Sequence, residues 1–200
     1  MKLHEIIAES RKPPLDGMVI GIDPGITGAI AVYYNGDWSI YDQPSKPIPN
    51  RHPSCEYDIA GMIDLMRTIR YQTLAHIQTA AYLEHIHAMP REGKVMRGSI
   101  GTWKLAGAFW LWRAILAHHD IVPTLVLPQR WKAFYGLLRQ EKEASRMMAM
   151  EMFPQLNDKM KFKKHHNRAE ALLIAQYGVH EELVKQKKRP VTDIKWGWEK

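Results

Sequence analysis

The sequence holds one cysteine, Cys55, among its 200 residues. A single thiol excludes an internal disulfide, and it also excludes a zinc site built from several cysteines. No apolar run approaches the roughly 20 residues that a membrane-spanning helix needs, and we find no internal repeat or low-complexity block. With 46% hydrophobic and 24% charged residues, the chain has the composition of a globular protein with a full hydrophobic core.

The N-terminal segment, residues 1–17, lacks the apolar core of a signal peptide. It also carries Glu5 and Glu9, which argue against an organellar transit peptide. We expect these residues to form a short arm before the main domain. We therefore expect a cytoplasmic or nucleoid-associated protein, with a phage or bacterial setting favoured and an organelle as the alternative.

The first 127 residues lack any excess of positive charge, because they hold 12 basic and 12 acidic residues. Residues 128–200 hold 16 basic and nine acidic residues, so they carry the whole formal net charge of +7. A basic excess on one part of a chain favours a polyanionic partner such as nucleic acid. The alternative is a solvated basic tail at residues 181–200.

The apolar pattern predicts an α/β domain over residues 18–180. Apolar runs at 18–22, 29–34 and 38–41 predict strands, and Asn35-Gly36 is typical of a tight hairpin turn. Further strands are predicted at 79–86 and 122–127, and helices at 54–70, 103–118, 129–135, 141–153 and 167–178. Ser54 is the expected cap of the first helix, and Gly178 the expected end of the last. This order predicts a mixed five-stranded sheet with helices on both faces.

The helix predicted at 103–118 is apolar almost all round, which favours burial in the core. Its aromatic residues could instead form an interface between two copies of the chain.

Acidic side chains occupy comparable places in three of these elements. Asp23 ends the first strand, Glu84 lies near the end of the fourth, and Glu170 lies early in the last helix. His166 precedes Glu170 by one helical turn, on the same face. If the two strands are neighbours, their carboxylates meet at one edge of the sheet, where hard oxygen ligands suit Mg²⁺. The four residues form a candidate two-metal site of the kind that cleaves phosphodiesters.

Each of these features has a simpler explanation when taken alone. Asp-Pro-Gly is a common turn sequence, and Asn167-x-x-Glu170 matches a helix capping box. The pairs His85/His87 and His118/His119 suggest zinc, but without cysteines this is the weaker interpretation.

Four stretches resemble the RuvC-type Holliday junction resolvases, and most closely their plastid and phage branch. They are "VIGIDPGITGAIAV", "YLEHIHAMP", "LPQRWKAFYGL" and "HHNRAEALLIAQYG". The resemblance implies a ribonuclease H-like fold, a homodimer, and two Mg²⁺ per active site, with Mn²⁺ able to substitute. It also implies that the substrate is a four-way DNA junction cut by paired, symmetrical nicks.

Carried over position by position, the resemblance assigns catalysis and metal binding to Asp23, Glu84, His166 and Glu170. The branch reads "KDHGRAEA" where this chain reads "KHHNRAEA". The fourth site residue therefore stays open among His165, His166 and Asn167.

Contacts to DNA phosphates are expected from the basic residues in and around these stretches. They are Arg130, Lys132, Lys161, Lys163, Lys164 and Arg168. The resemblance also places His87 where RuvC-type proteins carry an aromatic residue that helps to open the junction. A loop residue without DNA contact is the alternative for His87.

Two other functions fit parts of the sequence. "GIDPGITG" also resembles the phosphate loop of actin-like and sugar-kinase ATPases, but these need two lobes and a second glycine-rich loop. A non-catalytic ribonuclease H-like DNA-binding module would keep the basic third without needing all three acids. We therefore expect a Mg²⁺-dependent endonuclease that acts on junction DNA, with no membrane partner.

Overall fold

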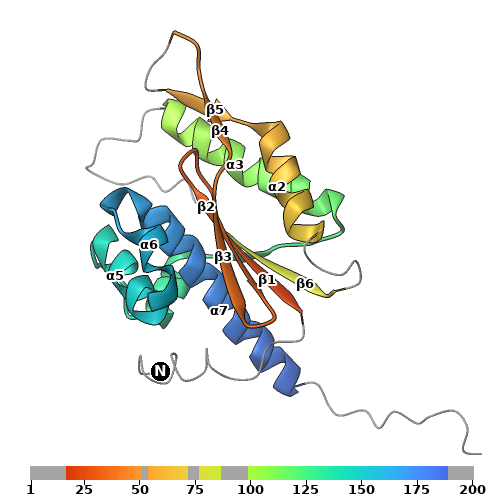
Figure 1. Cartoon of the computed structure of the whole chain (residues 1–200), viewed down its shortest axis with the longest axis vertical. Coiled ribbons are helices and arrows are strands. Elements are labelled where there is room, and N and C mark those ends of the chain that lie inside the picture. The colour runs from red at the N-terminus through yellow and green to blue at the C-terminus, as the bar shows by residue number, and fades with distance from the viewer. Residues whose placement is uncertain (1–16, 51–53, 72–76, 87–98, 189–200) are drawn as a thin grey trace, which may run out of the picture.

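A computed structural model describes residues 17–50, 54–71, 77–86 and 99–188 (Figure 1). The strands are β1 (Met18–Asp23), β2 (Ala29–Tyr34), β3 (Asp37–Asp42), β4 (Ser45–Pro47), β5 (Cys55–Tyr57), β6 (Thr79–Glu84) and β7 (Thr124–Val126). The α-helices are α2 (Ile59–Tyr71), α3 (Ser99–His118), α4 (Pro128–Phe134), α5 (Lys142–Met152), α6 (Asn157–Met160) and α7 (His166–Lys188). Two short 3₁₀ helices, η1 (Pro154–Leu156) and η2 (Lys163–His165), flank α6. No helix within these ranges is long and apolar enough to cross a membrane.

The main sheet has five strands in the order β3-β2-β1-β6-β7. The pairs β1–β2 and β2–β3 are antiparallel, whereas β1–β6 and β6–β7 are parallel. The predicted mixed five-stranded sheet is therefore confirmed. Asn35 and Gly36 have φ angles of 51° and 89°, as a two-residue hairpin turn between right-twisted strands requires.

Helices cover both faces of this sheet, as predicted (Figure 1). One face packs against α4, α5 and α7, with Trp131, Phe153 and Leu173 among the buried side chains. The other face packs against α2 and α3, with Met66 and Trp112 in its core. The domain is thus a three-layer sandwich, and β1 lies in the middle of its sheet.

A small hairpin, β4–β5, was missed by the sequence analysis. We expected a loop and then a helix capped by Ser54, but β5 pairs with β4 and α2 begins only at Ile59. The cap is Asp58, whose Oδ1 accepts a hydrogen bond of 3.1 Å from Gly61 N. The hairpin docks on α3, because Tyr57 donates to Lys104 O and Lys104 Nζ donates to Cys55 O. Such long-range contacts override the local pattern.

Helix α7 runs through Gly178 to Lys188, so the predicted end at Gly178 is wrong. A Cβ at Gly178 would lie 2.5 Å from Tyr82 Cδ2, and the glycine therefore lets the helix pack directly on β6. One turn later, Tyr82 Oη donates to Glu182 Oε1 at 2.7 Å. The residues expected to begin a basic tail thus belong to this helix as far as Lys188. The segment 159–166, expected as a loop, includes the end of α6 and η2.

The expected burial of the apolar helix is wrong for one side of α3. Trp112 is fully buried, but Trp103 and Trp110 are 79% and 61% exposed. Helices α2 and α3 form a single layer over the sheet, so the outer side of α3 has no further layer to cover it.

Candidate active site

Asp23 and Glu84 lie at the ends of two neighbouring parallel strands. The register pairs Ile22 of β1 with Leu83 of β6, so the two acids are the next residues on their strands. Ile22 and Leu83 belong to the core under α2 and α3. Because side chains alternate across a sheet, Asp23 and Glu84 project to the opposite face, toward α7.

Close packing brings α7 onto β1. A Cβ at Gly21 would lie 2.3 Å from Ala175 N and 2.6 Å from Ala171 O, so only glycine permits this approach. Glu170 lies on the turn before Ala171 and Ala175 and is buried, with 8% of its surface exposed. It therefore joins the two strand-end acids at one edge of the sheet.

The start of α7 is tied to the turn that follows Asp23. Asn167 Nδ2 donates to Thr27 Oγ1 at 2.9 Å and also to Thr27 O. This side chain therefore positions the helix against the turn rather than capping α7.

Glu84 has an unusual electrostatic environment. Burial raises the pKa of its carboxyl to about 7, the hydrogen bond from Trp131 opposes this rise, and the charge of Glu170 adds to it. Trp131 is itself fully buried, and its Nε1 donates to Glu84 Oε1 at 3.0 Å. The site thus holds two mutually repelling acids in a place with little solvent.

Glu170 has two partners from other helices. Lys132 Nζ lies 3.2 Å from Glu170 Oε1, and Ser145 Oγ donates to the same oxygen at 3.3 Å. Lys132 also lies over the Trp131 ring, 5.0 Å from its centroid. The capping-box explanation of Glu170 does not hold, and Lys132 lies among the acids rather than on an outer surface.

The three acids fit a divalent cation by their chemistry. Carboxylate oxygens are the ligands that Mg²⁺ prefers, and a cation would relieve the repulsion between Glu84 and Glu170. In the part of the chain that the structure describes, no three His, Cys, Asp or Glu side chains already stand as a group able to hold an ion. Lys132 and Trp131 each contact one oxygen of Glu170 and Glu84, respectively.

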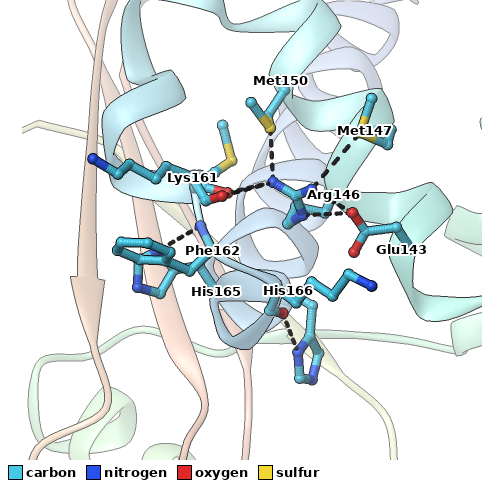
Figure 2. A network of polar contacts seen from close by, with 10 residues as sticks. Glu143, Arg146, Met147, Met150, Lys161, Phe162, His165 and His166 are labelled. Carbon is cyan, nitrogen blue, oxygen red and sulfur yellow. Dashed lines mark hydrogen bonds and ion pairs between the residues drawn. The ribbon is translucent and has the colours of Figure 1, made fainter.

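The two histidines before Glu170 have local partners. His166 Nδ1 lies 3.2 Å from Lys163 O (Figure 2). His165 Nδ1 accepts a hydrogen bond of 3.4 Å from Phe162 N, which makes it a backbone-binding residue. His166 as the fourth site residue stays a prediction.

The residues expected to bind DNA fall into different environments. Arg168 donates from Nε and Nη2 to the Asp42 carboxylate and from Nη1 to Lys159 O. Arg130 lies beside Tyr177, whose pKa is raised chiefly by burial. The three lysines of the segment before α7 are exposed and have no ion pair with a described residue; they are Lys161, Lys163 and Lys164. His87 lies outside the described residues.

Two residues of the site escaped the sequence analysis. Trp131 lies inside the quoted "LPQRWKAFYGL" stretch, directly before Lys132, which was already a candidate site residue. This position is the signal that could have identified Trp131. Ser145 lies in an ordinary amphipathic helix, and no pattern in the sequence marks it.

No protein-family model matches the sequence, and no curated protein sequence matches it. The structure is similar to Thermus thermophilus RuvC in complex with a Holliday junction substrate, with a TM-score of 0.52 and 15% identity, over 86% of this chain and 96% of that one. It is also similar to the yeast mitochondrial Holliday junction resolvase Ydc2, with a TM-score of 0.50 and 16% identity, over 94% of this chain and 87% of that one. At these identities the similarity concerns the fold, and the chain has the α/β, ribonuclease H-like fold of RuvC and Ydc2.

Proposed function

We propose that this protein is a metal-dependent DNA endonuclease that resolves four-way junctions. The observation that carries the proposal is the convergence of Asp23, Glu84 and Glu170 at one edge of the sheet. Glu170 lies close enough to Glu84 to raise the pKa of its carboxyl, and acids gathered in this way are typical of functional sites. The fold shared with RuvC and Ydc2 supports the same substrate class.

The three acids would hold two Mg²⁺ ions, with His166 as the proposed fourth residue. When bound, the ions would activate a water and stabilise the leaving oxygen of the phosphodiester. Trp131 holds Glu84 in place through its N–H. Lys132 is 30% exposed, so its ammonium can turn from Glu170 to the scissile phosphate once the acids are neutralised. His166 would accept a proton from the attacking water, a role that an imidazole commonly performs in catalysis.

Paired nicks require two active sites, and we place the contact between two copies on the outer side of α3. Trp103 and Trp110 are seven residues apart, so they lie on one side of the helix. Both are largely exposed, and the Arg113 guanidinium lies 4.6 Å from the Trp110 centroid. Exposed tryptophan beside arginine is typical of interface hot spots. Sedimentation analysis of Trp110→Glu should then give monomers where the wild type gives dimers.

The decisive experiment compares the wild type with Asp23→Asn on a labelled four-way junction in Mg²⁺. The wild type should cut two opposite strands at symmetrical positions, whereas the variant should bind the junction and leave it intact. Asp37→Asn is the matched control, because Asp37 is an exposed acid at the start of β3.

Three results would contradict the proposal. If Asp23→Asn cuts as well as the wild type, the assigned site is wrong. If the wild type binds junctions and never cuts in Mg²⁺ or Mn²⁺, the protein is a DNA-binding module. ATP hydrolysis without cutting would instead favour the actin-like ATPase.

A further inference from the structure

Phe162 is an exposed aromatic residue within a basic segment. Its side chain is 52% exposed, and it lies between the end of α6 and the start of η2. Lys161 Nζ and Lys164 Nζ lie 5.3 Å and 5.8 Å from the ring centroid. The His165 ring packs edge-on against it at 5.3 Å. Two lysine ammonium groups near an exposed ring are a combination that hydrophobic packing does not require.

The backbone that carries Phe162 is held firmly (Figure 2). Arg146, a buried residue of α5, donates from Nη1 to Met160 O at 2.8 Å and to Lys161 O at 3.3 Å. Arg168 Nη1 donates to Lys159 O at 2.8 Å. Two guanidinium groups therefore bind three consecutive carbonyls, so the segment presents Phe162 in a fixed position.

Both arginines are themselves held by acids. Arg146 forms an ion pair with Glu143, and Arg168 forms one with Asp42. Their charges are thus used within the protein. The exposed positive charge that remains on this segment belongs to four lysines, namely Lys159, Lys161, Lys163 and Lys164.

Helix α5 connects this segment to the acidic cluster. Ser145 donates to Glu170, and the next residue, Arg146, holds the carbonyls that precede Phe162. Two adjacent residues of α5 therefore hold Glu170 and the backbone next to Phe162.

We infer that Phe162 stacks on an unstacked base of the DNA beside the cleavage site, while Lys161 and Lys164 contact the flanking phosphates. This inference rests on the proposed function, since it assigns part of the substrate contact to that site. A base offers the flat π-face on which an exposed phenyl ring stacks. The neighbouring phosphates offer negative charge to the two lysines, which form no ion pair with a described acid. In a regular duplex the bases are already stacked, so the contact selects junction centres and single strands.

The test measures DNA affinity by fluorescence anisotropy in the non-cutting Asp23→Asn protein. The probes are a four-way junction, a single strand and a fully paired duplex. Phe162→Ala should weaken binding to the junction and the single strand by at least about fivefold, and leave duplex binding unchanged. Phe162→Trp should restore the affinity, whereas Phe162→Leu should not. Leu138→Ala is the matched control, because Leu138 is also exposed, at 47%, and should change nothing.

A second readout uses 2-aminopurine at the junction centre, whose fluorescence reports stacking. Its quenching on binding should disappear in Phe162→Ala and return in Phe162→Trp. Equal loss of affinity for all three DNAs would overturn the inference, and so would equal affinity of all variants. Loss of binding to phosphatidylserine vesicles, with DNA binding intact, would assign the ring to a membrane surface and overturn it too.

The inference and the proposed function can fail separately. Stacking that depends on Phe162, in a protein that never cuts junctions, would support the inference and refute the nuclease. If the protein cuts junctions but Phe162→Ala changes neither binding nor 2-aminopurine fluorescence, the nuclease is supported and the stacking inference is refuted. Thermal unfolding of each variant shows whether the fold is intact.

Discussion

Lys132 Nζ lies 3.2 Å from Glu170 Oε1, inside the cluster of acids at the end of β1 and β6. The lysine supplies a positive charge where Glu84 and Glu170 repel each other, and it is among the groups that lower the pKa of Glu84. The folded protein thus carries an internal cation at the place proposed for a metal ion. Lys132 and the metal should therefore compete for Glu170.

Removing that competitor should strengthen metal binding. We expect Lys132→Met to bind Mn²⁺ about three- to tenfold more tightly than the wild type, because a partly exposed ion pair contributes on the order of 1 kcal/mol. Cleavage should nevertheless slow, since the contact with the phosphate is lost. Calorimetric titration and a junction assay measure the two effects. Lys161→Met is the control and should leave Mn²⁺ affinity unchanged; weaker Mn²⁺ binding by Lys132→Met would refute the competition.

Trp131 offers a second test of the site, because its indole N–H donates a hydrogen bond to Glu84. Trp131→Phe should lower the free energy of unfolding by about 1–3 kcal/mol, as expected for a lost hydrogen bond to a buried charged group. It should also reduce cleavage and Mg²⁺ affinity by about tenfold, the usual effect of losing a residue that orients a metal ligand.

The chain contains a matched control for this change. Trp112 is equally buried, and its Nε1 donates to Gln43 Oε1 at 2.6 Å, away from the acids. Trp112→Phe should lose similar stability, measured by urea unfolding, while Mg²⁺ affinity stays the same. If both variants lose metal affinity equally, Trp131 has no specific role at Glu84.

The central elements of the fold could be predicted because their signals are local. The apolar runs at 29–34 and 38–41 and the Asn35-Gly36 turn predict the hairpin of β2 and β3, and both strands lie where expected. The hairpin β4–β5 depends instead on Tyr57 and Lys104, which are 47 residues apart. Glycine is the residue that most often ends a helix, so Gly178 predicts a helix end. Its actual role depends on Tyr82 of β6, against which α7 packs.

The candidate site divides in the same way. The sequence places Asp23 and Glu84 at strand ends, and the parallel pairing of β1 with β6 brings them together. The position of Lys132 could not be inferred, because a lysine on α4 can face solvent or the acids depending on how α4 packs on α7. The sequence therefore predicts the acids, and the structure adds the residues that control their charge.

Gly21 tests how the site is assembled. Gly21→Ala would place a methyl group 2.3 Å from Ala175 N and 2.6 Å from Ala171 O, and both obstacles are backbone atoms. We expect a loss of at least about 2–3 kcal/mol of stability, and lower cleavage because α7 must move away with Glu170. Gly107→Ala is the control: its Cβ would meet only Tyr57 Cε2 at 3.4 Å. In this helix interior the change should be neutral or stabilising by about 0.5–1 kcal/mol, and a Gly21→Ala protein as stable as the wild type would refute the close packing.

The ion pair between Asp42 and Arg168 predicts a pH dependence of stability. The hydrogen bond from Arg168, with its charge, holds the pKa of Asp42 below its usual value of 3.8. A carboxyl whose pKa is lowered by folding stabilises the protein above its unfolded pKa, and this contribution disappears as the pH falls through the lowered value. Because the Asp42 side chain is 60% exposed, we expect Asp42→Asn to cost no more than about 1 kcal/mol at neutral pH.

Urea unfolding of the wild type and Asp42→Asn, measured from neutral pH down to about pH 3, checks this expectation. The difference in unfolding free energy should be largest at neutral pH and should shrink as the pH falls below about 4. Asp64→Asn is the control, because Asp64 and Arg67 form a pair on α2 that is well exposed on both sides. Its effect should be smaller throughout. A difference for Asp42→Asn that is constant over the whole pH range would mean that the pair does not stabilise the folded state through its charge.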